Sequence, residues 1–151
     1  MTEIGISVQI EEKTAEVLAN NDWIKEQKFK SSEPVFIHGL IDGEHRGSLS
    51  GSLVIEREFV GNTFKEKDRY ANLGSVSVYP HEKWRRKGLG SSMIREFEKT
   101  AKGFSATKII GKIGASDLEE ESWLPVFYEK LGFTLNKLGE GYSFEKSLTR
   151  F

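Results

Sequence analysis

The chain has 151 residues, of which 37% are hydrophobic and 30% are charged, and its formal net charge is −1. This length and composition are typical of a single globular domain over residues 1–151, and the small net charge excludes the global basic field of many nucleic-acid-binding proteins. The sequence has no cysteine, which excludes disulfides, thiolate metal sites and a cysteine nucleophile, and it shows neither an apolar run of membrane-span length nor a signal-peptide pattern, so we expect a cytoplasmic protein without a membrane partner.

The first part of the chain predicts mainly strands. Residues 4–10 alternate apolar and polar side chains, which favours a strand, and 14–28 has the composition of one or two short helices. After a polar break at 30–34, the β-branched run 35–41 and the segment 48–60 flank an Asp-Gly turn. This pattern is typical of a β-hairpin.

The middle of the chain predicts a strand followed by an amphipathic helix. A polar, charged turn region is expected at 61–68, and the strand at 73–78 is ended by a proline. Apolar residues then recur at helical spacing from Leu89 to Ala101, and Gly103 is a natural stop.

The last third predicts a strand, a helix and a final hairpin. A strand at 108–115 is followed by a helix that begins near Asp117 or Ser122 and ends at Leu131. A hairpin formed by residues 133–148 completes the chain. The order β, α, β, β, β, α, β, α, β, β indicates a mixed sheet with helices on it, in the α/β (α+β) class.

The segment 84–92, WRRKGLGSS, lies between a predicted strand and the amphipathic helix. Helix N-termini have backbone N–H groups without intrahelical acceptors and a partial positive charge, and glycine lets an anion approach that backbone. The P-loop pattern is absent, and Met93 replaces the third glycine of the dinucleotide fingerprint. On these residues alone, a pyrophosphate-binding loop and an ordinary loop–helix junction both stay open.

Three sequence motifs, in order, resemble those of one enzyme family. RRKGLG at 85–90 resembles the Arg/Gln-x-x-Gly-x-Gly/Ala signature of the GNAT superfamily of N-acetyltransferases, and VSVYP at 76–80 is similar to the strand that precedes it there. FYEKLGF at 127–133 resembles the second hallmark of the family. The resemblance covers residues 73–148 and implies a mostly antiparallel mixed sheet of about seven strands, flanked by helices and splayed at the cofactor site.

The resemblance implies acetyl-CoA as the co-substrate and direct attack of an amine on its thioester in a ternary complex. The backbone N–H of Val78 would polarise the thioester carbonyl, the neighbouring strand amides would bind the pantetheine arm, and the loop with the helix N-terminus would bind the pyrophosphate. Tyr128 would donate a proton to the departing thiolate. The implied cofactor-binding residues are Val76, Ser77, Val78, Arg85, Arg86, Lys87, Gly88, Leu89, Gly90 and Ser91.

The catalytic residues have alternative interpretations. Without the motif, Tyr128 is more typical of an aromatic core residue than of an acid. Glu56 and Glu58 lie two apart on a predicted strand and share a face, so they are candidates for the general base, although a solvated surface pair is favoured. Asp117 is a further candidate but more typical of a helix cap. Asn72 occupies the position where one branch of the family has a glutamate.

Other classes of function are weaker. His38, His45 and His81 are scattered without ligand-like spacing, so no metal is expected. The leading interpretation is an acetyl-CoA-dependent N-acetyltransferase acting on a primary amine of a small molecule or a protein. The alternative is a non-catalytic acetyl-CoA-binding or protein-interaction module on the same scaffold. Nucleic-acid binding is the weakest interpretation because the chain is slightly acidic, and a homodimer stays open.

Overall fold

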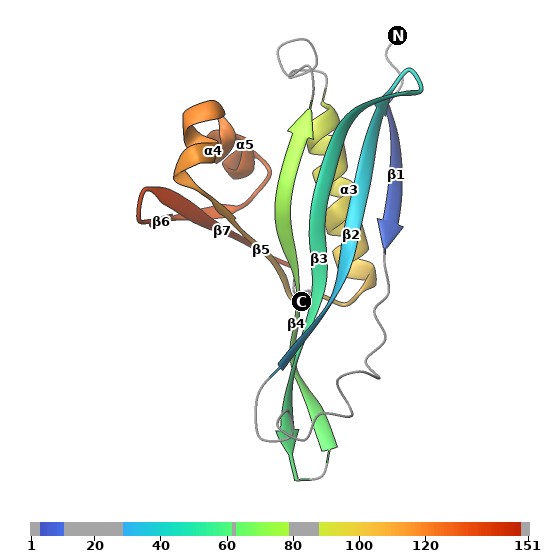
Figure 1. Cartoon of the computed structure of the whole chain (residues 1–151), viewed down its shortest axis with the longest axis vertical. Helices are drawn as coiled ribbons and strands as arrows, with labels where there is room; N and C mark the ends of the chain where they lie inside the picture. Colours follow the sequence, from blue (N-terminus) through green and yellow to red (C-terminus); the bar gives the residue numbers. More distant parts are fainter. Residues whose placement is uncertain (1–3, 11–28, 62, 79–87, 149–151) are drawn as a thin grey trace.

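The structure is a computed structural model that describes residues 4–10, 29–61, 63–78 and 88–148 (Figure 1). Its strands are β1 (Ile4–Ile10), β2 (Phe29–Ile41), β3 (Glu44–Val60), β4 (Thr63–Val78), β5 (Lys108–Ile113), β6 (Thr134–Leu138) and β7 (Gly141–Ser147). Its helices are α3 (Leu89–Gly103), α4 (Ala115–Glu120) and α5 (Leu124–Lys130).

One open sheet contains all seven of these strands, in the order β1-β2-β3-β4-β5-β7-β6. Five of the six strand pairs that the described residues form are antiparallel, and one, β4 with β5, is parallel. This mostly antiparallel mixed sheet with helices on it confirms the predicted fold class.

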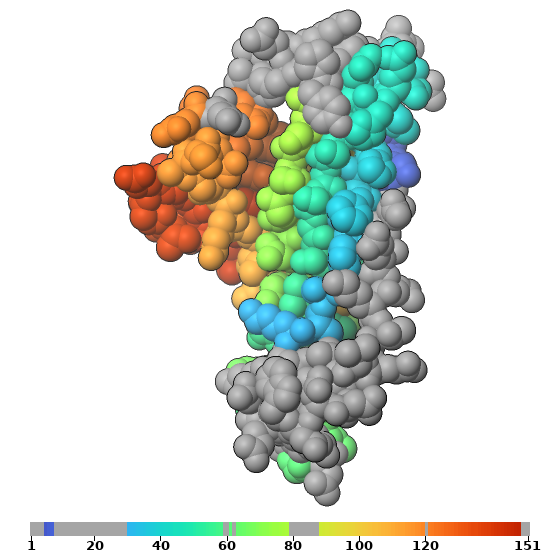
Figure 2. All heavy atoms as spheres, viewed as in Figure 1, coloured from blue at the N-terminus to red at the C-terminus, as the bar shows by residue number. Residues whose placement is uncertain are grey.

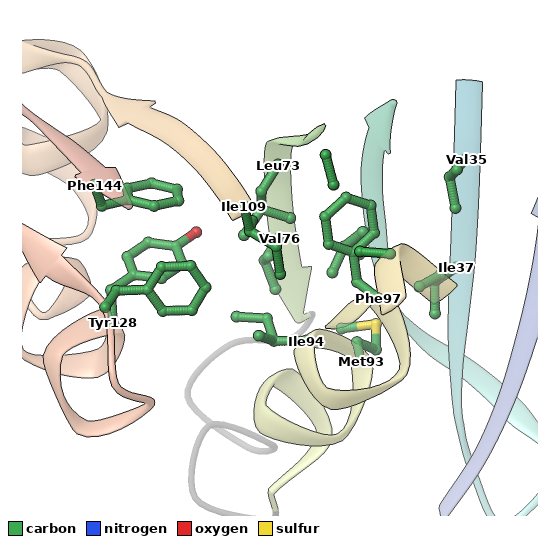
Figure 3. Packing of buried hydrophobic residues seen from close by; sticks show 14 of the residues in the cluster. Val35, Ile37, Leu73, Val76, Met93, Ile94, Phe97, Ile109, Tyr128 and Phe144 are labelled. Atoms are coloured by element: carbon green, nitrogen blue, oxygen red, sulfur yellow. The ribbon is translucent and has the colours of Figure 1, made fainter. Parts of the chain in front are cut away.

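Helix α3 covers one face of strands β2, β3 and β4. As predicted, the apolar residues at helical spacing, Leu89, Met93, Ile94, Phe97 and Ala101, are buried. They pack into one hydrophobic core with the inward-facing residues of the sheet (Figure 3). The helix lies behind the strands in Figure 1, so Figures 1 and 2 show the opposite face of the sheet.

An aromatic cluster fills the core on the β5–β7 side. Tyr128 of α5 stacks on Phe144 of β7, with ring centroids 4.2 Å apart, and Phe133 contacts both rings edge-on. The cluster is continuous with the core beneath α3. Helices α3 and α5 therefore cover the same face of the sheet.

Strands β4 and β5 separate soon after they meet. They pair over three positions, from Ala71 to Leu73 on β4, although β4 continues to Val78. Leu73 and Ser75 pair with consecutive residues of β3, so Gly74 between them is a bulged residue. Bulges bend a strand and increase its twist. The bulge coincides with the point where β4 and β5 diverge, and Figure 1 shows the resulting V-shaped gap.

Two strands are longer than the sequence predicted. The polar break expected at 30–34 lies inside β2, and most of the turn region expected at 61–68 lies inside β4. Cross-strand partners stabilise these polar segments, as in the ion pair of Lys30 with Glu56 at 3.4 Å. Within the described residues, the pairing of β1 with β2 ends at Val35, next to Pro34, so the proline interrupts no described hydrogen bond to β1.

The single helix expected up to Leu131 is divided into α4 and α5. Glu121, between them, has non-helical dihedral angles (φ −136°, ψ 69°), and Pro125 lies in the first turn of α5. The carboxylate of Asp117 accepts a hydrogen bond from the N–H of Gly114 at 3.1 Å, which confirms its role in capping.

The helices expected at 14–28 lie outside the described residues. Of the helices that the structure does describe, none has the length and apolar character needed to span a bilayer.

Candidate functional site

A pocket of about 80 Å³ opens between α3, α5 and the end of β4. It lies on the helix-covered face, beside the gap between β4 and β5. Its lining comes from both sides of that gap: Val76, Val78, Gly88, Gly90, Ser91, Trp123 and Phe127.

The N-terminus of α3 leaves backbone N–H groups available at this pocket. Gly88 is the N-cap in the left-handed conformation (φ 82°), and the N–H of Ser92 donates to its carbonyl at 3.0 Å. The N–H groups of Leu89, Gly90 and Ser91 precede this bond and have no acceptor within the helix. In the described chain, α3 has no side-chain cap and no acidic residue in its first turn. With the positive end of the helix dipole, these groups suit an anion such as a phosphate.

Two glycines of the β2–β3 hairpin bring the start of α3 close to the sheet. A Cβ atom at Gly39 would lie 2.7 Å from Cδ1 of Leu89, and one at Gly47 would lie 2.9 Å from Cε of Met93. Leu89 and Met93 would have to shift, and a Cβ atom at Gly47 would also lie 2.9 Å from the carbonyl oxygen of Ser77, so glycine allows this close approach. The fully buried Leu89 fixes the helix N-terminus over this hairpin. Sequence reasoning missed this role, because neither glycine is near Leu89 in the chain.

The structure brings five of the predicted cofactor-binding residues together in the pocket: Val76, Val78, Gly88, Gly90 and Ser91. The side chain of Leu89 instead lies in the core. Ser77 is exposed and pairs with Ser48 on β3, so its side chain lies on the opposite face from that of the buried Val76. The predicted Arg85, Arg86 and Lys87 lie outside the described residues.

Two aromatic residues that were not among the predicted site residues, Trp123 and Phe127, line the same pocket. Trp123 and Phe127 contact each other edge-to-face, with ring centroids 5.3 Å apart. A Cβ atom at Gly90 would lie 3.3 Å from Cζ of Phe127, so the glycine keeps the pocket open. The spacing of four residues between the aromatics was the available signal, because it places both on one face of a helix and Tyr128 on another.

Tyr128 lies in the core beside the gap, with 4% of its surface exposed. Figure 3 shows its hydroxyl oxygen pointing away from α5, toward the side where Ile109 and Val76 lie. Burial raises the pKa of Tyr128 well above its usual range, and the carboxylates of Glu121 and Asp117 add to the shift. The hydroxyl therefore keeps its proton at any physiological pH. The packing of Tyr128 is that of a core residue.

The structure places Glu56 and Glu58 away from this pocket. Glu56 pairs with Lys30 and accepts a hydrogen bond from the hydroxyl of Tyr70 at 3.2 Å. Seven positions of β3 separate it from Leu49, the partner of Val76, a distance of about 23 Å along a strand. Glu58 lies further along the same strand. Neither carboxylate is brought to the gap between β4 and β5.

A larger pocket, of about 560 Å³, opens on the other face of the sheet. Asn72 lines it and is exposed between buried neighbours on β4, so its side chain points away from α3. Lys108 and Lys112 alternate in the same way with buried residues of β5. Gly74 and Gly111, at the point of divergence, also line it. The two pockets thus lie on opposite faces of the sheet, each lined by residues at or beside the gap.

The histidines are less scattered than the sequence suggested. Nδ1 of His38 and Nε2 of His45 lie 3.3 Å apart across the β2–β3 hairpin. Within the described ranges, no group of three or more histidine, aspartate or glutamate side chains could hold a metal ion.

Comparisons with known proteins agree with this geometry. A family model of the acetyltransferase (GNAT) domain matches residues 42–135, more than half of the chain. No curated protein gave a significant sequence match. A GNAT-family protein from Desulfovibrio desulfuricans has a similar structure, with 15% identity, a TM-score of 0.57 and coverage of 77% of this chain and 69% of that one.

Two further solved structures share the fold. An acetyltransferase from Streptococcus agalactiae is 16% identical over 95% of this chain and 99% of that one, with a TM-score of 0.55. The yncA protein from Salmonella typhimurium, solved with its cofactor acetyl-CoA, is 18% identical over 78% and 66%, with a TM-score of 0.52. At these identities the structural likeness shows the fold, and the family model shows the family. The chain belongs to the GNAT acetyltransferase family.

Proposed function

We propose that this protein is an acetyl-CoA-dependent N-acetyltransferase that acetylates a primary amine by direct attack in a ternary complex. The observation that carries the proposal is the pair of pockets on opposite faces of the sheet, beside the gap between β4 and β5. A donor held on the helix-covered face and an acceptor on the other face can meet in this gap. Holding both reactants in one geometry lowers the entropic part of the barrier.

The residues present fit acetyl-CoA on the helix-covered face. The uncapped N-terminus of α3 suits its pyrophosphate, and Gly88 leaves open space, since a Cβ atom there would meet nothing within 4 Å. Beyond Leu73, β4 has no pairing with β5, so its edge facing the gap is free to bind an amide-containing arm. The yncA structure was solved with acetyl-CoA, which supports the same co-substrate for this chain.

The chain supplies binding, orientation and one proton donor. Bound acetyl-CoA supplies an acetyl group activated as a thioester. We assign the backbone N–H of Val78 to polarisation of the thioester carbonyl and the hydroxyl of Tyr128 to the leaving sulfur. Because its pKa is raised far above the usual thiol value of about 8.5, Tyr128 stays protonated and acts as a hydrogen-bond donor. In the reaction, the N–C bond forms as the C–S bond breaks, and the proton that the amine loses is balanced by the proton that the departing thiolate takes up, so CoA leaves as the thiol.

The function is tested by acetyl transfer to a panel of polyamines, amino acids, aminoglycosides and peptides, with release of CoA as the readout. Tyr128→Phe keeps the ring stack on Phe144 and removes the hydroxyl, so kcat is expected to fall about 10- to 100-fold with little change in melting temperature. Tyr142→Phe, a half-buried tyrosine outside both pockets, is the matched control. Binding of acetyl-CoA without turnover on any amine would instead establish the non-catalytic alternative.

A further inference from the structure

The larger pocket has a polar lining that selects one kind of acceptor. It lies on the face of the sheet away from α3, the face shown in Figure 2. Its polar side chains are Asn72, Lys108, Lys112, Asn136, Ser143 and Glu145. Three of these six are charged, and the charges are not balanced.

Lys112 carries the unbalanced charge. Nζ of Lys108 lies 3.9 Å from a carboxylate oxygen of Glu145, so these two charges compensate each other. Lys112 is exposed, and within the described residues it has neither an ion pair nor a hydrogen bond from its side chain. The described residues that line the pocket therefore carry one net positive charge, located on β5 next to the gap.

The neighbours of Lys112 on the same face can donate hydrogen bonds. Lys112 pairs with Ser143 on β7, and Ser143 pairs with Asn136 on β6. Directly paired residues have Cβ atoms about 5 Å apart and point to the same face. These three cross-strand neighbours thus present an ammonium, a hydroxyl and a carboxamide side by side. All three can donate to one oxyanion, and none is an acceptor only.

We propose that the acceptor amine also carries a carboxylate, which is bound by Lys112 with Ser143 and Asn136. This inference rests on the proposed function, because it names the substrate class of the same site. Gly111, next to Lys112 on β5, stands at the point where β4 and β5 diverge. A carboxylate held at Lys112 therefore leaves the amino group of a small amino acid within reach of the gap.

The charges also argue against other acceptors. A polyamine would place a second ammonium near Lys112 without a free carboxylate to receive it. A phosphate dianion would meet a single uncompensated lysine and the nearby carboxylate of Glu145, whereas a carboxylate has one charge and needs one cation. A small amine with a single carboxylate is the acceptor that fits.

Matched substrate pairs test the inference. Glycine is compared with glycinamide, and β-alanine with 3-aminopropanamide, by kcat/KM for acetyl transfer. The wild-type protein is expected to prefer the carboxylate of each pair. Lys112→Met should lower kcat/KM for the carboxylate of each pair about 10- to 100-fold more than for the amide, and Lys112→Glu should reverse the preference. Lys99→Met, an exposed lysine on α3, is the control and should keep the wild-type preference.

A binding experiment separates this inference from the proposed function. Propionate and propionamide are titrated into the protein without acetyl-CoA, and backbone amide shifts are followed by NMR. Propionate, but not propionamide, should shift the backbone amide signals of Lys112, Ser143 and Asn136. Lys112→Met should abolish these shifts. The inference is overturned if acetyl transfer to the amides is as fast as to the carboxylates, or if propionate causes the same shifts in Lys112→Met as in the wild type. The proposed acetyl transfer is not affected by either result. Absence of transfer to every amine overturns both, even where propionate binds.

Discussion

Tyr128 has a packing role that the structure shows and a catalytic role that we propose. Its ring belongs to the core, where it stacks on Phe144 and contacts Phe127 and Phe133. Its hydroxyl has no hydrogen-bond partner among the described residues, although its oxygen is not fully buried. In the reaction that we propose, this hydroxyl donates to the leaving sulfur, which a phenylalanine packed in the same place could not do.

The buried hydroxyl predicts a specific loss of stability in alkali. An unfolded tyrosine ionises near pH 10, whereas burial keeps Tyr128 protonated to higher pH. Above about pH 10 the unfolded chain therefore binds fewer protons than the folded one, and the free energy of unfolding falls by about 1.4 kcal/mol per pH unit from this group. Below that pH the group adds no pH dependence. Denaturant unfolding between pH 8 and 11.5 measures the slope.

Two variants isolate this contribution from the titration of lysines. Tyr128→Phe should unfold with a shallower alkaline slope than the wild type, because the titrating hydroxyl is gone. Tyr142→Phe should keep the wild-type slope. Equal slopes in Tyr128→Phe and the wild type would show that the hydroxyl is solvated in the folded protein.

At the scale of elements, two glycines at the start of α3 have different roles. Gly90 lines the pocket, whereas Gly88 adopts a backbone conformation with positive φ. Gly90→Ala adds a methyl group 3.3 Å from Phe127, inside the pocket, and alanine favours a helix over glycine by about 0.5–1 kcal/mol. We expect the dissociation constant of acetyl-CoA to rise about tenfold, a loss of about 1.4 kcal/mol, without a loss of stability. Calorimetric titration and thermal unfolding measure the two effects.

Gly88→Ala is the comparison for that variant. Here the added methyl group meets nothing within 4 Å, but the residue has φ 82°, and a non-glycine residue in this conformation costs about 1–2 kcal/mol. Stability should therefore fall. Gly88→Asn, which tolerates the conformation better, should restore part of it. If Gly90→Ala binds acetyl-CoA as tightly as the wild type, the pocket does not hold the cofactor.

The sequence correctly predicted elements whose apolar residues recur with a regular spacing along one buried face. Helix α3 was predicted because five apolar residues recur at helical spacing and all of them face the core. The first half of β4 was interpreted as a turn region because it is polar, as in Lys65 and Glu66. Such a strand is stabilised by partners far away in the chain: Arg69 donates to the carbonyl of Phe104, and the hydroxyl of Thr107 donates to the carboxylate of Asp68. Single-sequence patterns contain no record of such partners.

The residues of the candidate site also fall into those named from the sequence and those that only the structure brings together. Gly88 was named from the motif as a cofactor-binding residue, and the structure places it at the N-cap of α3, next to its neighbours in the motif. The larger pocket was missed because Asn72, Lys112 and Asn136 come from three strands that only the sheet order brings together. No spacing rule links them.

At the scale of the whole molecule, the sheet consists of two parts that meet in only a short pairing. Strands β4 and β5 pair over only three positions. The smaller pocket is nevertheless lined by Gly90 from α3 and Phe127 from α5, so its shape depends on the distance between these two helices. Lys146 on β7 joins the two parts. Its Nζ donates to the carboxylate of Glu98 on α3 at 3.1 Å and to the carbonyl of Leu131, at the end of α5, at 3.0 Å.

Removing this lysine should weaken both stability and cofactor binding. Lys146→Met leaves the half-buried Glu98 and the carbonyl of Leu131 without their shared donor, which we expect to cost about 1–2 kcal/mol after allowance for solvent screening. Lys102→Met is the matched control, because Lys102 pairs with the same Glu98 at 3.6 Å from an exposed position and should cost less than about 0.5 kcal/mol. Denaturant unfolding and acetyl-CoA titration measure the two variants. If Lys146 only contributes charge to Glu98, both variants will lose the same stability and bind acetyl-CoA equally; if it sets the distance between α3 and α5, only Lys146→Met will bind it more weakly.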